Sequence, residues 1–464
     1  MTMTAIILAG GQGTRMKSPL PKVLHPVAGK PMIIRTLEGC QQAGVQNLRL
    51  VVGHGQNLVK SVLDPIQEML QVKIYVQDQQ LGTADAVKAA DLGSLQGDVL
   101  IMNGDHPLIK TADIKNFFAS FQKLNLDLAV FTVEVSEKND FGRIVRANGK
   151  LQSIVEVKEA SAEVLKIKEI NTGIYVVKAE VLQKLIPQVK NENAKKEFYL
   201  TDIITLARDK ALKVDAILSE NGDIAHGVNS QMELAAATAK VYASNCEKLL
   251  NNGVIILDPK TTYIEDTVIV GAGAVLYPGV FLRGKTAIGA FSVVEPNCFI
   301  SDSVINDGVQ IKAGSYIEKT IIHSQASVGP YARLRPDTTI GQGAHVGNFV
   351  EMKKVNFGAK SKAGHLTYLG DADIGEDVNI GCGTITCNYA ADKKKYKTII
   401  KDRVFVGSDT QLVAPVTVES DSIIASGTTV TKDVPAGALA LSRTAQVNKE
   451  GYAKKFKKPE DGNK

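Results

Sequence analysis

Aliphatic residues recur every six positions through the second half of the chain, and this spacing constrains the fold more than any other feature. The series includes Ile264, Val270, Leu276, Leu282, Ile288, Val294 and Ile300. Glycine often follows the aliphatic residue, as in Val270-Gly271 and Ile340-Gly341. Neither the helical period of 3.6 nor the strand period of 2 stays in register at a step of six. The spacing predicts a hexapeptide parallel β-helix, in which each coil covers the next, rather than a β-sandwich with frequent turns.

Composition places the chain among globular proteins with room for about three domains. Of its 464 residues, 44% are hydrophobic and 22% are charged. No run approaches the roughly 18 apolar residues of a membrane span, and the N-terminus lacks the basic start of a signal peptide. We therefore predict a cytoplasmic protein without a membrane partner. The net charge of +5 is small for this length, and no stacking motif accompanies it, so nucleic-acid binding is not predicted.

The five cysteines are scattered along the chain and form no C-x-x-C pair. This pattern indicates neither a disulfide framework nor a zinc cluster.

A glycine-rich turn follows the first predicted strand, which covers Thr4 to Leu8. Three glycines within Gly10 to Gly13 let the backbone approach an anion and direct N–H groups at it. Arg15 adds a planar cation, and Lys22 follows seven residues later. The chemistry suits a nucleotide triphosphate, although the turn matches neither G-x-G-x-x-G nor the Walker pattern.

Strand-like and helix-like segments then alternate. Strands are expected at Leu48 to Val52, Val72 to Val76 and Asp98 to Met102, with a helix-like segment from Gln56 to Leu70. The alternation predicts an α/β, Rossmann-like domain with a mainly parallel sheet, whose ligands bind at the carboxyl ends of the strands.

Polar side chains stand just beyond two of these strand ends. Gln77 could read the edge of a base, although a lone glutamine there is more typical of the surface. Asp105 could hold Mg²⁺, which prefers carboxylate oxygen, or could simply form a turn.

The sequence Ser230-Gln231-Met232-Glu233 forms a capping box that predicts a helix running to about Leu250, where Asn251-Asn252-Gly253 ends it. We therefore expect a nucleotide-binding domain over residues 1–228, a linker helix over 229–250, a β-helix over 251–448 and a basic tail over 449–464.

The hexads are interrupted at Ala363 to Asp373 and at Asn388 to Arg403, and both segments are expected to loop out of the β-helix. Arg335 and Lys353 offer charge to a sugar phosphate, and His365 offers a base near neutral pH. Zinc is the alternative for several histidines on a β-helix, but His323, His345 and His365 lack the tight spacing of the γ-class carbonic anhydrases.

The string Leu8 to Met16, followed by Pro21-Lys22, resembles the sugar-nucleotide pyrophosphorylases. The resemblance implies that Gly11, Arg15 and Lys22 hold the triphosphate of UTP, with Lys22 and Arg15 neutralising charge in catalysis. It implies that Asp105 and Asn229 bind Mg²⁺. It further implies substrate contacts from Leu8, Ala9, Gly10, Gly11, Lys22, Gln77, Gly82, Thr83, Asn103, Gly104, Asp105, Gly142, Glu156, Asn171 and Asn229.

Both halves in this order resemble the bifunctional bacterial family of N-acetylglucosamine-1-phosphate uridylyltransferases and glucosamine-1-phosphate N-acetyltransferases. The resemblance implies a left-handed β-helix, a homotrimer with acetyl-transfer sites between neighbouring subunits, and UDP-N-acetylglucosamine as the product. It implies His365 as the general base and Arg335, Lys353, Tyr368 and Asn379 as contacts to glucosamine 1-phosphate. Acetyl-CoA contacts are implied for Cys382, Asn388, Tyr389, Ser408, Ser426 and Arg443.

Two departures from that family concern coenzyme A. Cys382 and Ser426 stand where the family commonly has alanine, so the pantetheine contacts are expected to differ slightly. One rival function is a pyrophosphorylase whose β-helix only oligomerises or regulates. Another is a nucleotide-binding regulatory subunit without turnover, but that function would require Lys22 or Asp105 to be missing, and both are present.

Overall fold

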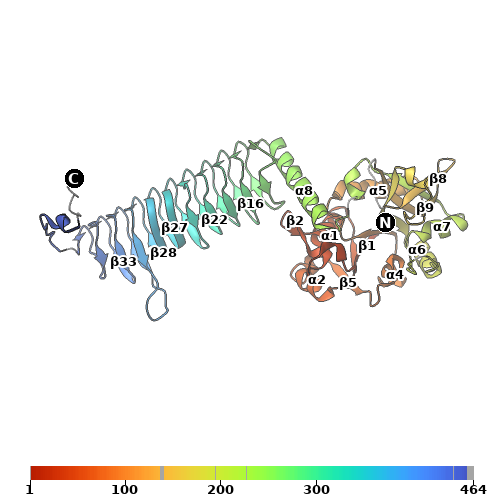
Figure 1. The fold of residues 1–464 in the computed structure, drawn as a ribbon, viewed down its shortest axis with the longest axis horizontal. Coiled ribbons are helices and arrows are strands. Elements are labelled where there is room, and N and C mark those ends of the chain that lie inside the picture. Colours follow the sequence, from red (N-terminus) through yellow and green to blue (C-terminus); the bar gives the residue numbers. More distant parts are fainter. Residues whose placement is uncertain (1, 136–140, 194, 226, 443, 457–464) are drawn as a thin grey trace, which may run out of the picture. The chain divides into compact units, whose positions relative to one another are not determined.

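The computed structural model describes residues 2–135, 141–193, 195–225, 227–442 and 444–456 (Figure 1). The chain divides into two compact units, Met1–Ser244 and Asn245–Lys464. Within the described residues, none of the helices has the length and apolar character that crossing a bilayer requires.

The first unit is built on a nine-stranded sheet with the order β11-β7-β10-β6-β1-β4-β5, to which the hairpin β8-β9 is attached. β1 pairs in parallel with both β4 and β6, whereas β10 runs antiparallel to β6 and β7. The strands are β1 (Met3–Ala9), β4 (Asn47–Val52), β5 (Val72–Val76), β6 (Asp98–Asn103), β7 (Leu128–Glu134), β8 (Arg143–Ala147), β9 (Lys150–Val155), β10 (Glu169–Lys178) and β11 (Val214–Leu218), with a separate pair β2 (Pro26–Val27) and β3 (Lys30–Pro31). The predicted α/β, Rossmann-like fold is confirmed.

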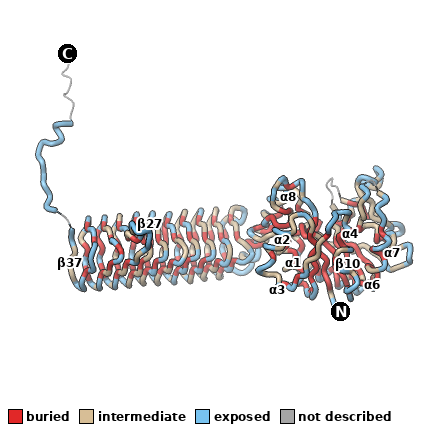
Figure 2. The backbone as a smooth tube through the Cα atoms, turned by 90° about the horizontal axis from the view of Figure 1, so that it is seen from below, coloured by how far each residue is buried: buried red, intermediate tan, exposed pale blue. Residues whose placement is uncertain are grey.

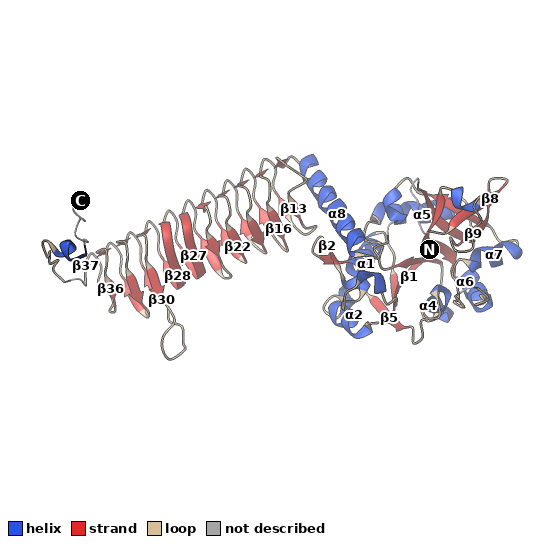
Figure 3. Ribbon diagram, in the orientation of Figure 1, coloured by secondary structure: helices blue, strands red, loops and turns tan. Residues whose placement is uncertain are grey.

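Helices cover both faces of this sheet because successive residues of its buried strands point to opposite sides (Figure 3). Ile7 of β1 packs with Leu37 and Phe117 on one face, and Ile6 packs with Val87 and Ile203 on the other. The helices of the unit are α1 (Met32–Gln42), α2 (Gln56–Leu63), α3 (Gln67–Leu70), α4 (Thr83–Lys88), α5 (Thr111–Lys123), α6 (Ala179–Leu185) and α7 (Asp202–Asp209).

The single helix-like segment expected from Gln56 to Leu70 is wrong, because α2 ends at Leu63 and α3 begins at Gln67. Pro65 lies in the break, and a proline has no N–H to continue the helical hydrogen bonds. The chain instead turns, with the Ile66 N–H donating to the Leu63 carbonyl.

The helix predicted after Ser230 is α8 (Gln231–Asn251). The Glu233 N–H donates to Ser230 Oγ at 3.2 Å, as a capping box requires. In a capping box the Glu233 carboxylate would accept a hydrogen bond from the Ser230 N–H. Here it accepts instead from the Asn229 N–H, at 2.6 Å. This contact ties Asn229 to the start of the helix.

The second unit is the predicted parallel β-helix. Short strands from β12 (Ile255–Ile256) to β37 (Leu439–Ala440) form one 26-stranded sheet, consistent with a left-handed β-helix. Each early strand pairs in parallel with the third strand after it, so β13 (Tyr263–Ile264) pairs with β16 (Phe281–Arg283). Figure 2 shows buried residues repeating along the inside of the coils, and these are the aliphatic members of the hexads.

Later coils carry the predicted acetyl-transfer residues on two long strands and their short neighbours. The strands are β24 (Ser327–Val328), β25 (Arg333–Leu334), β26 (Thr338–Ile340), β27 (His345–Phe357), β28 (Lys362–Ile374), β29 (Asn379–Ile380), β30 (Ile385–Cys387), β31 (Thr398–Ile400) and β32 (Phe405–Val406).

The expectation that Ala363 to Asp373 loops out is wrong, because this segment lies within β28, paired in parallel with β27. The chain therefore stays in the ladder, and the step of six continues through the buried Ala363 and Leu369, with an alanine in the place of a larger aliphatic residue. The second interruption does contain a loop, between Cys387 and Thr398, before β31 resumes the coil (Figure 1).

Close contact between coils at the corners explains why glycine recurs there. A Cβ added to Gly347 in β27 would lie 1.8 Å from the Gly364 carbonyl oxygen of β28, far inside van der Waals contact. Gly364 itself has open space around the corresponding position.

We expect Gly347→Ala to destabilise the β-helix by at least the 1–3 kcal/mol that is typical of overpacking. For a unit of this size, that loss lowers the melting temperature by roughly 2–4 °C per kcal/mol, measurable by calorimetry. Gly364→Ala is the matched control and leaves the melting temperature within about 2 °C. Equal melting temperatures for the two variants would refute the steric explanation.

Candidate active sites

The carboxyl ends of β1, β6 and β9 border a cleft of about 510 Å³ in the first unit. The predicted substrate residues that line it are Leu8, Ala9, Gly10, Gly11, Lys22, Gln77, Gly82, Thr83, Asn103, Asp105, Gly142, Glu156, Asn171 and Asn229. Arg15 lines an adjoining cavity, whose walls share Leu8 and Glu156 with the first. Gly104 does not line the cleft, since a Cβ there would meet the Ile33 side chain at 2.8 Å.

The glycine-rich turn lies close to Lys22, and its conformation explains why position 13 is a glycine. Gly13 has a φ of 63°, which favours glycine, and an added Cβ would lie 2.8 Å from Lys22 Cβ. The Lys22 side chain extends its ammonium group to Asp105 Oδ2 and to Asn229 Oδ1, the latter at 3.0 Å.

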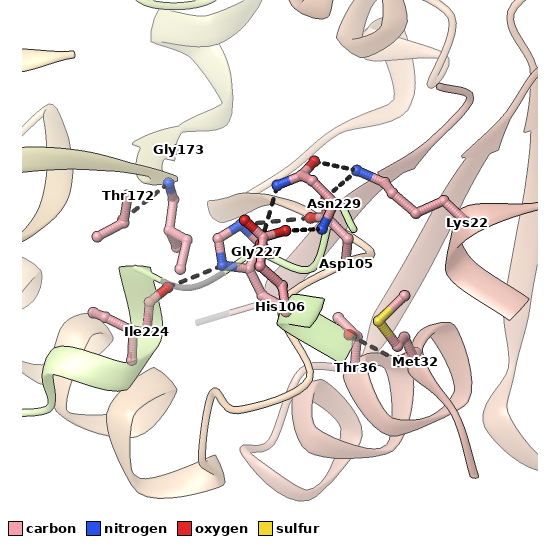
Figure 4. Close-up of polar contacts among 12 residues, drawn as sticks. Lys22, Met32, Thr36, Asp105, His106, Thr172, Gly173, Ile224, Gly227 and Asn229 are labelled. Atoms are coloured by element: carbon pink, nitrogen blue, oxygen red, sulfur yellow. Dashed lines mark hydrogen bonds and ion pairs between the residues drawn. The ribbon is translucent and has the colours of Figure 1, made fainter. Parts of the chain in front are cut away.

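Three chemical groups from distant parts of the sequence therefore meet at one end of the cleft (Figure 4). Asp105 is only 6% exposed, and its Oδ1 atom has no hydrogen-bond partner among the described residues. Burial raises the pKa of Asp105, but the charge of Lys22 and its hydrogen bond to the carboxylate act in the opposite direction, and the net pKa lies below its usual value. The carboxylate is thus ionised and available to a cation.

Gln77 is buried rather than on the surface, so the surface interpretation of this residue is wrong. Its Nε2 donates to Asp85 Oδ2 at 2.7 Å and to the Gly82 carbonyl at 3.2 Å. Its Oε1 lies on the Gly10 side, 3.2 Å from the position of a Cβ on that glycine. These hydrogen bonds fix the amide so that Gln77 Oε1 can accept a hydrogen bond from a ligand in the cleft.

The opposite side of the cleft carries Glu156 and Asn171. Burial raises the pKa of Glu156, and the nearby carboxylate of Glu159 adds to the shift. Asn171 Oδ1 accepts from the Gly173 N–H at 2.9 Å and from the Tyr175 hydroxyl at 3.2 Å, which fixes the amide. A carboxylate and an oriented amide suit the hydroxyl and N-acetyl groups of a sugar.

Gln80, His106 and Glu197 also line this cleft, although none of them is among the predicted site residues. Gln80 Nε2 donates to the Gly10 carbonyl at 2.7 Å and so supports the glycine-rich turn. His106 was visible beside Asp105 in the sequence, but no spacing rule distinguishes it from an ordinary buried histidine.

In the β-helix, parallel pairing places most of the predicted acetyl-transfer residues on neighbouring coils. Glu351 of β27 pairs with Tyr368 of β28, and Lys353 pairs with Gly370. Arg335 donates from Nη1 to Glu351 Oε1 at 2.8 Å. Arg335, Lys353 and Tyr368 therefore lie on successive coils.

His365 and Asn379 lie on the adjoining part of the same coils. His365 pairs with Asn348 across β27 and β28, and Asn379 pairs with Lys362. The His365 side chain is exposed on the single chain. Among the described residues, no group of three or more His, Cys, Asp or Glu side chains is arranged to hold a metal ion.

A lysine that the sequence interpretation missed also belongs to this region. The charge of Lys395 lowers the pKa of Lys353, and the charge of Arg335 adds to the shift. Lys395 lies in the loop between β30 and β31, so only the structure brings it beside Lys353. Three cations close together, without an equal number of anions, indicate a site for an anion.

The predicted acetyl-CoA residues occupy the next coils. The Asp409 N–H donates to the Cys382 carbonyl at 2.7 Å, and the Gly427 N–H donates to the Ser408 carbonyl at 2.8 Å. Cys382, Ser408 and Ser426 thus stand at successive corners. Asn388 is buried and donates to Asp371 at 2.5 Å, whereas the neighbouring Tyr389 is 62% exposed. Arg443 lies outside the described residues.

Comparisons with known proteins cover the whole chain. The nucleotidyl transferase family model matches residues 4–224, and the GMPPB C-terminal domain model matches residues 260–356. The chain is 58% identical over 459 residues to the bifunctional protein GlmU of Bdellovibrio bacteriovorus, covering 99% of both chains. It is 45% identical to bifunctional protein GlmU of Pelobacter propionicus (98% of this chain, 99% of the other) and 44% identical to that of Geotalea uraniireducens (98% and 99%).

Proposed function

Because this chain belongs to the family of bifunctional GlmU proteins, we infer that it is a bifunctional transferase that makes UDP-N-acetylglucosamine. It acetylates glucosamine 1-phosphate with acetyl-CoA and transfers the uridylyl group of UTP to N-acetylglucosamine 1-phosphate, releasing pyrophosphate. The product feeds the synthesis of peptidoglycan and lipopolysaccharide precursors. The match over nearly the entire length, including both domains, carries this conclusion.

We propose that uridylyl transfer takes place in the cleft of the first unit. A phosphate oxygen of N-acetylglucosamine 1-phosphate attacks the α-phosphorus of UTP in line, and pyrophosphate leaves as the new O–P bond forms. The nucleophile is already an anion, so no protein base is needed, and catalysis consists of positioning and charge neutralisation. The N–H groups of the turn at Gly10 and Gly11, together with Arg15 and Lys22, bind the triphosphate.

The residues at the end of the cleft fit Mg²⁺. Asp105 and Asn229 offer the hard oxygen ligands that this ion prefers, and the buried Asp105 Oδ1 has no hydrogen-bond partner within the described part of the chain. We propose that these two residues hold Mg²⁺, which when bound supplies positive charge to the phosphates. Lys22, which bridges the same two side chains, positions them.

We propose that acetyl transfer uses His365 as its base. The neutral 2-amino nitrogen of glucosamine 1-phosphate attacks the thioester carbonyl, and His365 takes the proton that the nitrogen loses. The C–S bond then breaks and the coenzyme A thiolate leaves, which the protonated imidazole can neutralise. Hydrogen-bond donors near the carbonyl oxygen stabilise the tetrahedral intermediate.

Arg335, Lys353 and Lys395 would bind the phosphate of glucosamine 1-phosphate, with Tyr368 and Asn379 contacting the sugar. Asn388, Tyr389, Ser408 and Arg443 are proposed neighbours of acetyl-CoA. Cys382 and Ser426 would meet coenzyme A mainly through their backbones.

Removing Lys395 should weaken the binding of glucosamine 1-phosphate. A hydrogen bond to a charged group contributes about 1.5–3 kcal/mol, so we expect Lys395→Ala to raise the KM for this substrate by roughly 10- to 100-fold. The KM for acetyl-CoA should change less than threefold. Lys397→Ala is the control, because Lys397 in the same loop pairs instead with Asp373. Equal KM values for wild type and Lys395→Ala would remove Lys395 from the phosphate site.

Exposed apolar side chains support contact between subunits, and the family resemblance implies that the subunits form a homotrimer. Phe349, Leu366 and Tyr389 are 59%, 60% and 62% exposed on the single chain, and all lie on the coils that carry the acetyl-transfer residues. We propose that neighbouring subunits cover these side chains and complete the acetyl-CoA groove. Light scattering should then give three times the mass of one chain, and a monomer with full acetyltransferase activity would contradict the proposal.

We also propose a cytoplasmic location, where UTP and acetyl-CoA are available.

The experiment that tests the proposed function measures thiol release and pyrophosphate release on the same purified protein. Glucosamine 1-phosphate with acetyl-CoA should release coenzyme A thiol, and N-acetylglucosamine 1-phosphate with UTP should release pyrophosphate. Release of pyrophosphate without release of thiol would show that the protein is a pyrophosphorylase with that activity alone. If neither product were released, the remaining interpretation would be a nucleotide-binding regulatory subunit without turnover.

A further inference from the structure

His106 lies beside the proposed metal site, with its ring held by a backbone contact. It follows Asp105 directly after β6 and is only 4% exposed. Its Nδ1 lies 2.9 Å from the Ile224 carbonyl oxygen, and its Nε2 lies 3.6 Å from Asp105 Oδ1 (Figure 4). The ring therefore turns one nitrogen to the backbone and the other to the carboxylate.

The Ile224 contact determines which ring nitrogen carries the proton. A carbonyl oxygen can only accept a hydrogen bond, so Nδ1 must donate to it. In the neutral ring the lone pair then lies on Nε2. A bond from Nδ1–H to a backbone carbonyl is the usual support of a metal-binding histidine, because it orients the ring and fixes the tautomer.

The space beside Nε2 is kept open. The distance of 3.6 Å to Asp105 Oδ1 is too long for a hydrogen bond, and Oδ1 has no other partner among the residues described. A Cβ on Gly227 would lie 3.5 Å from Nε2 and 3.4 Å from Oδ1, whereas the glycine leaves that volume free. Metal bonds of about 2.1 Å to each atom would let one cation reach both.

We propose that His106 Nε2 is a third protein ligand of the cation held by Asp105 and Asn229, and that it raises the affinity of this centre for divalent transition metals relative to its affinity for Mg²⁺. An imidazole nitrogen adds affinity for first-row transition ions, for Mn²⁺ the least among them, whereas Mg²⁺ favours an all-oxygen shell. The inference rests on the uridylyltransferase function proposed above, whose metal it specifies.

Mn²⁺ serves as the test ion, because its unpaired electrons report nitrogen ligands in pulsed electron paramagnetic resonance. Full-length protein is loaded with Mn²⁺ in the presence of UDP-N-acetylglucosamine. We expect a nitrogen coupling that changes when the protein is labelled with ¹⁵N-histidine. His106→Asn should abolish the coupling, because its amide can still donate to the Ile224 carbonyl but has no atom in the place of Nε2.

Metal affinities provide the second readout. His106→Asn should lower the affinity for Mn²⁺ at least tenfold and that for Mg²⁺ less than threefold, so that the preference moves toward Mg²⁺. His25→Asn is the matched control, since His25 is also buried, has an Nε2 without a hydrogen bond, and does not line the cleft. It should leave the coupling intact. Thermal unfolding checks that each variant is folded.

A wild-type protein that binds Mn²⁺ without a histidine coupling would overturn the inference, as would an unchanged ratio of Mn²⁺ to Mg²⁺ affinity in His106→Asn. Both results are compatible with normal pyrophosphate release, so they would leave the proposed function in place. Absence of pyrophosphate release with either metal would instead refute the uridylyltransferase function itself.

Discussion

His365→Ala lowers the kcat of acetyl transfer by about 10²- to 10⁴-fold, the usual contribution of a general base. The amine can still attack the thioester, but no side chain is left to take its proton. Thiol release from acetyl-CoA measures the loss. Pyrophosphate release by the same protein stays within twofold of the wild-type rate, because His365 belongs to the β-helix and the uridylyl site to the other unit.

His323→Ala is the matched control for this prediction. His323 is another exposed histidine of the β-helix, and its Nδ1 lies 3.4 Å from Asn306 Nδ2. Its removal should leave both activities near the wild-type rate. Full acetyl transfer by His365→Ala would remove His365 as the base.

Asp105→Asn has the opposite effect and lowers the kcat of uridylyl transfer by roughly 10²- to 10³-fold. The substitution removes the negative charge that binds the metal and leaves the Lys22 ammonium without its carboxylate partner. Charge stabilisation by a metal contributes several kcal/mol to the transition state, and 1.36 kcal/mol corresponds to a factor of ten. Thiol release by this variant remains at the wild-type rate.

Asp98→Asn controls for the loss of a buried carboxylate, because Asp98 lies on β6, the strand that precedes Asp105. Asp98 begins β6, is 5% exposed and accepts a hydrogen bond from Gln122 at 3.1 Å, away from the cleft. It should retain uridylyl transfer within about threefold. If both aspartate variants lost this activity equally while remaining folded, the effect of Asp105 would be structural rather than electrostatic.

Repetition made the second unit predictable from the sequence. A buried aliphatic residue such as Ile264 or Leu282 occupies the same place in every coil, so one physical rule applies many times. The expectation of a loop at Ala363 to Asp373 was wrong because the small Ala363 obscures the six-residue step, which β28 continues through the buried Ala363 and Leu369.

In the first unit, local chemistry indicated the glycine-rich turn, Lys22 and Asp105, because each follows a strand or turn with a recognisable pattern. The contacts between them depend on segments far apart in the sequence. Lys22 reaches Asn229 across more than two hundred residues, and Lys395 reaches Lys353 through a loop without regular structure. The role of His106 depends on the Ile224 carbonyl, which no motif specifies.

The central claim is that one chain carries two reaction centres that work independently. Mixing His365→Ala with Asp105→Asn in the presence of glucosamine 1-phosphate, acetyl-CoA and UTP tests it most directly, with UDP-N-acetylglucosamine measured by chromatography. Neither variant alone should form the product at an appreciable rate, whereas the mixture should form it after a lag in which N-acetylglucosamine 1-phosphate accumulates. A mixture of folded variants that forms no product would contradict two separate centres.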